Sequence, residues 1–252
     1  MDTICKFCRK PAALQQSHIV PEFLYQYDDL HRVLSVYGSG TRPKLQQKGI
    51  REPLLCFLCE QYFNEHFEKP MKRLWIDVPR LPAHYIPGGE YEIKGLDYSV
   101  LKLFHLSVLW RADVATKVEG GVDLGPHSEV IRQMLRTRQP GSPTTYPILA
   151  EALYLPKSHE PAAGVVMLPR RSSIRGQTVY LAVFGGCAWH YVVSSHSIPV
   201  EVRHNALAAD GRIIALVSNL RSIIEIEHAL STYERNAQTR GWGDPWRRKR
   251  AK

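Results

Sequence analysis

Two pairs of cysteines constrain this chain more than any other feature of its sequence. Cys5 and Cys8 form one C-x-x-C pair, and Cys56 and Cys59 form another. A gap of two residues lets both sulfurs of a tight turn face one ion at about 2.3 Å, and two such pairs supply the four thiolates of a tetrahedral zinc site. The spacing therefore predicts a small module held by a structural Zn²⁺ ion. The fifth cysteine, Cys187, is expected in the core.

The composition is that of a folded protein with a basic surface. Hydrophobic residues make up 44% of the 252 residues, and the formal net charge of +9 indicates a polyanionic partner. No apolar run approaches the roughly 20 residues that span a bilayer, and the first residues lack the apolar segment of a signal peptide. We therefore expect a cytoplasmic protein without a membrane partner, in which thiols stay reduced and are free to bind metal.

The organisation predicted from the sequence is α+β, with two domains. A stretch rich in proline and glycine, RLPAHYIPGGEYEIKG, separates a zinc-stapled module at residues 1–78 from a mixed α/β body at residues 90–252. In the body, apolar residues recur every three or four positions over 96–118, which predicts an apolar core helix. A second, amphipathic helix is expected over 127–139, entered through Pro126.

The end of the body should contain a β-hairpin and a closing helix. Residues 177–195 are rich in β-branched and aromatic types on both sides of Gly185 and Gly186, which favours two strands and a turn. Residues 218–240 are expected to form an amphipathic helix capped by Ser218 or Asn219.

A short segment between the cysteine pairs carries a family resemblance. In QQSHIVPEF, His18 is followed by Ile-Val-Pro. The sequence here resembles the HNH, or ββα-metal, endonuclease family, whose zinc-knuckle members carry a His-Ile-x-Pro segment between two C-x-x-C pairs. The resemblance covers residues 1–75 only. It implies a ββα-metal fold for the module and hydrolysis of DNA, with RNA left open, and it suggests a setting in restriction or phage defence, with an ATPase as one possible partner.

The resemblance also implies a role for four residues. His18 falls on the general base, and Ser17 falls where the family usually has a metal-binding aspartate. Glu60 falls on the helix ligand just after the last cysteine, and Asn64 on a second helix ligand. These residues would hold a catalytic Mg²⁺ or Mn²⁺ ion. The exchange of Ser17 and Glu60 relative to the family moves one negative charge from strand to helix and leaves the site one carboxylate.

The chemistry of phosphodiester hydrolysis explains these residue types. A neutral imidazole with a pKa near 6.5 can deprotonate water at cellular pH. Mg²⁺ is held through one or two carboxylates, while water and substrate oxygens complete its octahedron. On a helix, Asn64 lies about 40° around from Glu60, so both can face one ion. His66 lies about 120° from Glu60 and is expected to be solvated or structural.

Basic residues outside the module are candidate nucleic-acid contacts, although both groups could equally be solvated surface. The leading alternative to a nuclease is a non-catalytic zinc-binding adaptor for nucleic acid or protein, and a more remote one is a protein-interaction module. Ser17 favours the adaptor, whereas His18 together with Glu60 favours the nuclease. The candidate contacts are Arg170, Arg171 and Arg175 in one stretch, and Arg247, Arg248, Lys249 and Arg250 in the C-terminal tail.

Overall fold

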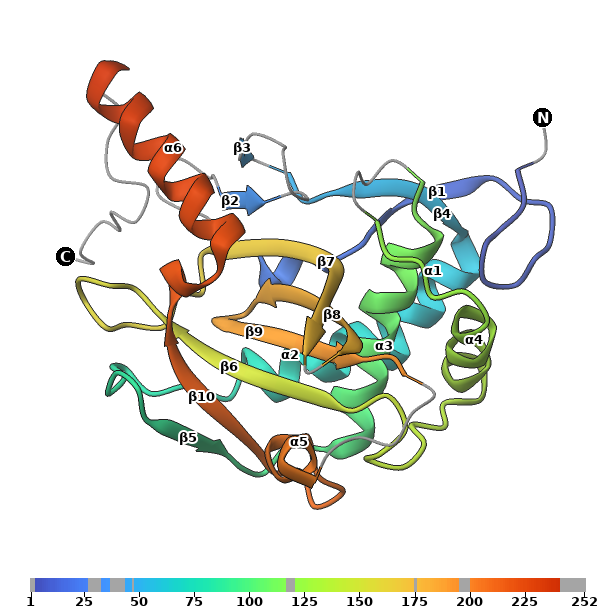
Figure 1. Ribbon diagram of the computed structural model, residues 1–252. Helices are drawn as coiled ribbons and strands as arrows, with labels where there is room; N and C mark the ends of the chain where they lie inside the picture. Colours follow the sequence, from blue (N-terminus) through green and yellow to red (C-terminus); the bar gives the residue numbers. More distant parts are fainter. Residues whose placement is uncertain are drawn as a thin grey trace.

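The computed structural model describes residues 3–26, 33–36, 44–46, 48–116, 121–174, 176–194 and 200–240. These residues form a mixed α+β fold, which confirms the predicted class at that level (Figure 1). Among the helices so described, none is both long enough and apolar enough to cross a membrane.

The strands and helices are spread along the whole chain. In chain order they are β1 (Leu14–His18), η1 (Glu22–Leu24), β2 (Val33–Val36), β3 (Lys44–Gln46), β4 (Arg51–Cys56), α1 (Phe57–Phe63), η2 (Asn64–Glu68), α2 (Lys69–Trp75), β5 (Glu90–Ile93), α3 (Tyr98–Val114), α4 (His127–Thr137), β6 (Ile148–Tyr154), β7 (Val165–Ile174), β8 (Gln177–Phe184), β9 (Cys187–Val192), α5 (Val200–Asn205), β10 (Ile213–Asn219), η3 (Leu220–Ser222) and α6 (Ile224–Arg240).

The strands form one small sheet and one large sheet. β1 and β4 pair antiparallel in the small sheet, and the large sheet has the order β3-β2-β7-β8-β9-β6-β10-β5. The segment between β1 and β4 supplies β2 and β3, so the N-terminal region contributes to the large sheet. There β2 pairs in parallel with β7, with Leu34 opposite Val165. One buried core runs from Cys5 to Val217. A domain boundary between residues 78 and 90 stays a prediction.

Helix α3 lies at the centre of the fold, where it contacts strand β7 of the large sheet and the helices α2 and α4 (Figure 1). Its residues from Leu101 to Ala112 are all buried, which confirms the predicted core helix. The helix begins after Asp97, whose carboxylate accepts a hydrogen bond from the Val100 amide at 3.0 Å. Helix α6 packs on the opposite face of the large sheet, where Ile226 and other apolar residues meet the sheet.

The predicted hairpin is confirmed as β8 and β9, joined through Gly185 and Gly186. Both glycines have positive φ, 61° and 83°, which glycine adopts without the steric cost of a side chain. Position 185 also has no space for a larger residue, because a Cβ there would lie 2.8 Å from the indole nitrogen of Trp75. The same nitrogen donates to the Gly185 carbonyl at 3.1 Å. The turn is thereby joined to the end of α2.

The predicted start of the last helix is wrong. Ser218 and Asn219 end strand β10, where they pair with β6, and α6 begins only at Ile224. The Asn219 side chain does accept a capping bond, from the Arg221 amide at 2.9 Å, but the helix that it caps is the short η3. Pairing with β6 therefore carries the strand up to the capping residue. The amphipathic helix over 127–139 is confirmed as α4, which starts directly after Pro126.

Candidate metal centre and the adjoining His18 site

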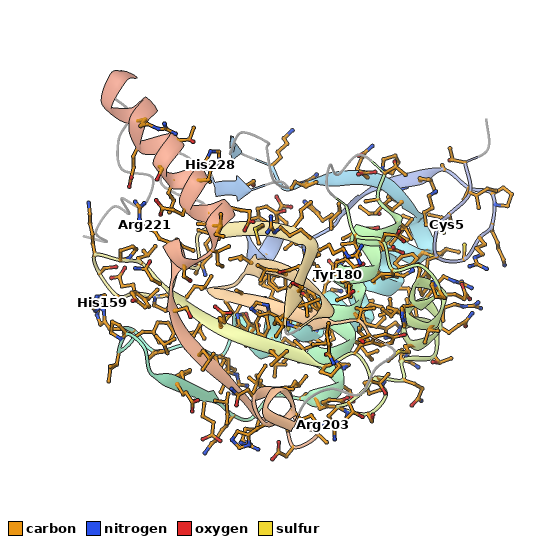
Figure 2. All side chains as sticks on the ribbon, viewed as in Figure 1. Cys5, His159, Tyr180, Arg203, Arg221 and His228 are labelled. Atoms are coloured by element: carbon orange, nitrogen blue, oxygen red, sulfur yellow. The ribbon has the colours of Figure 1, made fainter. Side chains whose placement is uncertain are left out.

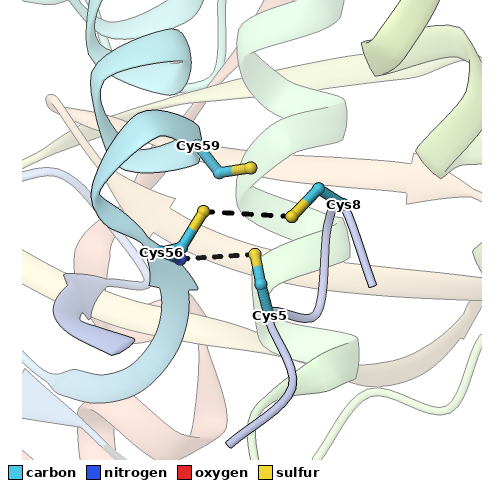
Figure 3. Close-up of side chains that lie close together, drawn as sticks. All are labelled: Cys5, Cys8, Cys56 and Cys59. Carbon is cyan, nitrogen blue, oxygen red and sulfur yellow. Dashed lines mark hydrogen bonds between the residues drawn. The ribbon is translucent and has the colours of Figure 1, made fainter. Parts of the chain in front are cut away.

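The four N-terminal cysteines come together in the structure, as predicted (Figure 3). Their Sγ atoms all lie within 4.8 Å of one another. The Sγ atoms of Cys8 and Cys56 are 3.9 Å apart, close to the roughly 3.8 Å edge of a tetrahedron with Zn–S bonds of 2.3 Å. Within the described residues, no second group of three or more His, Cys, Asp or Glu side chains meets in this way. The cluster could bind a structural metal ion such as zinc.

The local backbone explains how each cysteine pair is placed. Arg9 adopts the left-handed conformation, with a φ of 61°, and its amide donates to the Cys5 carbonyl at 2.9 Å, which closes the first turn. Cys56 is the last residue of β4 and the N-cap of α1, and Cys59 lies in the first turn of that helix. The Cys56 amide donates to the Cys5 sulfur at 3.3 Å, so the two pairs are in direct contact.

The Cys5 thiol is prepared for metal binding by its surroundings. Burial raises its pKa, but amide N–H groups of Cys56, Cys8 and Phe7 point at the sulfur and together bring the pKa down to about 7. The thiolate is the form that binds a metal ion. The backbone therefore favours the thiolate at Cys5, whereas burial raises the pKa of the Cys8 and Cys59 thiols.

Ser17 and Glu60, which the resemblance places at the catalytic ion, are in direct contact. Ser17 is fully buried on β1, and its Oγ donates to Oε2 of Glu60 at 2.6 Å. The contact follows from the topology, because β4 pairs with β1 and runs directly into α1. Asn64 lies one regular turn after Glu60, since its amide donates to the Glu60 carbonyl.

His18 ends β1, and its side chain is 17% exposed. Arg51, the residue opposite on β4, donates from Nε to Nε2 of His18 at 2.8 Å. The Glu22 carboxylate is 3.9 Å from the same nitrogen. Burial, and secondly the charge of Arg51, lower the pKa of His18 below its usual value of 6.5. Because Nε2 accepts a hydrogen bond, the proton of the neutral ring is on Nδ1.

Arg111 and Glu68 belong to this site but were not singled out from the sequence. The Arg111 side chain is 0% exposed, and Nη1 donates to the His18 carbonyl at 2.8 Å and to Glu68 Oε1 at 2.6 Å. Its guanidinium lies 5.4 Å from the centre of the Phe63 ring. Two signals were available: Glu68 continues the four-residue spacing from Glu60 through Asn64, and Arg111 carries a charge within an apolar helix.

The helix that carries Glu60 and Asn64 is not regular throughout. Residues Asn64–Glu68 form a π-helical turn between α1 and α2. The cause is Pro70 in the next turn, since proline has no N–H to donate and its ring would clash with the carbonyl four residues earlier, that of His66. The His66 ring packs 4.5 Å from Tyr62, and its Nδ1 lies 3.4 Å from an Arg138 nitrogen. These contacts agree with the structural role expected for His66.

The basic candidates outside the module lie elsewhere on the molecule. Arg170, on β7, is 18% exposed and forms an ion pair with Glu225 at the start of α6. Both residues line a cavity of about 220 Å³, together with His190, whose Nε2 lies 2.9 Å from Glu151 Oε1. Arg171 is exposed. Figure 2 shows Arg221 and His228, which belong to this end of the molecule, far from Cys5. Arg175, Arg247, Arg248, Lys249 and Arg250 lie outside the described residues.

Comparisons of this chain with protein-family models, with curated proteins and with solved structures found no match. What the site can do chemically therefore follows from its own residues. They comprise four thiols that can hold one structural ion, a neutral histidine beside an arginine, and a carboxylate in contact with the serine that precedes that histidine.

Proposed function

We propose that this protein is a divalent-metal-dependent endonuclease that hydrolyses DNA phosphodiester bonds, with His18 as the general base and a structural zinc ion in the cysteine cluster. The observation that carries the proposal is the 2.6 Å hydrogen bond between Ser17 and Glu60. The order of β1, β4 and α1, two antiparallel strands followed by a helix, also supports it.

The Ser17–Glu60 contact bears on the most serious departure from the family pattern. The family usually has a carboxylate at the position of Ser17 and a neutral ligand at the position of Glu60. Here the Glu60 carboxylate lies within hydrogen-bonding distance of the serine. The single carboxylate of the site is therefore located where strand β1 meets helix α1. A Mg²⁺ or Mn²⁺ ion bound there would neutralise charge on the phosphate and on the leaving oxygen. Glu60 and the Asn64 amide oxygen would be its ligands from this chain, a number in keeping with a cation that retains several waters.

His18 has the protonation state that a base requires, but its basic nitrogen is occupied. Its lowered pKa keeps the ring neutral at cellular pH. Nε2 carries the lone pair and accepts the hydrogen bond from Arg51, so His18 can take a proton only when Arg51 releases it. Arg51 is 35% exposed, and a phosphate is a strong partner for a guanidinium. We infer that the bound substrate draws Arg51 away and thereby frees the base.

Arg111 acts as a positioning residue for the same base. Its hydrogen bond to the His18 carbonyl fixes the end of β1, and its ion pair with Glu68 joins that strand to the helix that bears Glu60. The base and the carboxylate are thus fixed to a common support, α3.

Cleavage of plasmid, linear duplex and single-stranded DNA in Mg²⁺ or Mn²⁺ tests the proposal. His18→Ala and Glu60→Ala should each abolish cleavage while zinc content and the unfolding temperature are retained. His66→Ala is the matched control from the same helix and should cut nearly as well as the parent protein. Undiminished cleavage by His18→Ala in metal-supplemented buffer would end the assignment.

The alternative, a non-catalytic zinc-binding adaptor, is favoured by a different aspect of the same contacts. Glu60 and His18 already have partners within the protein, Ser17 and Arg51. An adaptor would bind DNA with a steep dependence on salt and would cut none of it in any metal. The cleavage assay therefore separates the two functions directly.

A further inference from the structure

Three large apolar side chains are exposed beside the cysteine cluster. Ile4 is 49% exposed, Phe57 is 59% exposed and Leu58 is 76% exposed. Ile4 directly precedes Cys5, and the other two lie between the cysteines of the second pair. The contact between the cysteine pairs brings both segments to one place. We call these three residues the knuckle platform. Apolar side chains that gather on a surface indicate a binding site more often than isolated ones do.

The chain segment that carries Ile4 is positively charged. Residues 3–21 contain Lys6, Arg9 and Lys10 but no aspartate or glutamate. Both lysines are exposed, whereas Arg9 forms an ion pair with Glu129. The Lys6 amide donates to the Leu54 carbonyl at 3.0 Å, which places this lysine beside the end of β4, just before Phe57. A partner that suits this surface carries negative charge and also presents apolar faces.

Phe57 is close to the proposed catalytic carboxylate. It precedes Glu60 by three residues on α1, and side chains at this spacing are neighbours, with about 5–6 Å between their Cβ atoms. Helical side chains lean toward the N-terminus, so the Phe57 ring extends beyond the start of the helix. A base stacked on that ring would hold its own phosphate within about one helical turn of Glu60.

We propose that the knuckle platform binds unpaired bases of single-stranded DNA, with Phe57 as the stacking residue and Lys6 as a phosphate contact. An aromatic ring can stack only on a base whose face is free, and paired bases in a duplex are covered by their neighbours. The single strand is therefore the form of the substrate that this surface selects. The position of the strand relative to Glu60 rests on the proposed nuclease function, but binding to the platform does not.

Binding is measured in the His18→Ala background, so that the probe stays intact, by the fluorescence anisotropy of a labelled oligothymidylate and of a duplex of equal length. The parent should prefer the single strand. Phe57→Ala should weaken single-strand binding by roughly 5- to 150-fold, and Phe57→Trp should retain it. Lys6→Gln should reduce the slope of log affinity against log salt by about 0.7. Ile224→Ala, at a residue 79% exposed at the start of α6, should change nothing.

Binding by Phe57→Ala that equals the parent would overturn the inference. So would competition by polyglutamate with no oligonucleotide binding, since the partner would then be an acidic protein. Zinc content and the unfolding temperature of each variant establish that an effect is local. If Phe57-dependent binding is present but Mg²⁺-dependent cleavage is absent, the inference holds and the nuclease proposal fails. If cleavage depends on His18 but Phe57→Ala binds and cuts like the parent, the reverse is true.

Discussion

Replacing Arg111 by methionine should destabilise the protein by about 3–5 kcal/mol. Methionine keeps an unbranched apolar stem in a similar volume, so the change removes the guanidinium more than the packing. What remains is the Glu68 carboxylate, 19% exposed and without its 2.6 Å partner, and the His18 carbonyl without its 2.8 Å donor. Most of the free-energy cost of breaking such a pair comes from the buried charge that is left without a partner.

Urea unfolding at saturating zinc gives the free energy, and thermal unfolding gives a second measure. For a protein of this size each kcal/mol shifts Tm by about 2–4 °C, so a decrease of about 6–20 °C is expected. Exchanging both Arg111 and Glu68 for methionine should recover part of the loss, because no unpaired charge is left.

The matched control is an exposed ion pair on the same run of helix. The side chains of Glu65 and Lys69 are 52% and 47% exposed, so Lys69→Met should change the free energy of unfolding by no more than about 0.5 kcal/mol. If Arg111→Met costs as little as Lys69→Met, the guanidinium does not support the site, and the reasoning on Arg111 as a positioning residue is refuted.

Three further predictions concern the metal centre and the base. Cys56→Ser should remove most of the zinc, about one ion per chain, and destabilise the N-terminal region, as elemental analysis and thermal unfolding would show. Because burial and Arg51 lower the pKa of His18, the acidic limb of kcat/KM should lie below pH 6.5, and Arg51→Gln should move it upward; a limb that does not move contradicts this cause. Ser17→Asp would bring a second carboxylate against Glu60. The gain in metal affinity, measured from the cleavage rate as a function of Mg²⁺ concentration, should therefore be less than about tenfold. A larger gain would mean that Glu60 is not a ligand of the ion.

The features that were predicted correctly depend on neighbours along the chain. Each C-x-x-C pair lies within four consecutive residues, and the core helix α3 follows from apolar residues at helical spacing. The turn at Gly185 needs a residue that tolerates positive φ, a property of glycine itself. Each of these patterns can be interpreted without knowing what packs against it.

The features that were missed depend on residues far apart in the sequence. The Arg111 contact with Glu68 spans 43 residues, and the Arg51 contact with His18 spans 33. A local pattern can mark one partner, as the charge of Arg111 within an apolar helix does, but it does not say which distant residue that partner meets, because topology brings the two together. The start of α6 was misplaced for the same reason: Asn219 has the chemistry of a helix cap, but pairing with β6 keeps it at the end of a strand.

The π-helical turn at Asn64–Glu68 has a consequence for anyone who aligns this helix with another. A π turn closes its hydrogen bond one residue later than an α turn, so the run from Phe57 to Trp75 contains, in effect, an inserted residue. Matched without a gap to a regular helix, every position after the turn is displaced by about 100° around the axis. Trp75, which reaches the Gly185 carbonyl at 3.1 Å, would then be assigned to the wrong face. An alignment of this chain needs a one-residue gap just before Lys69.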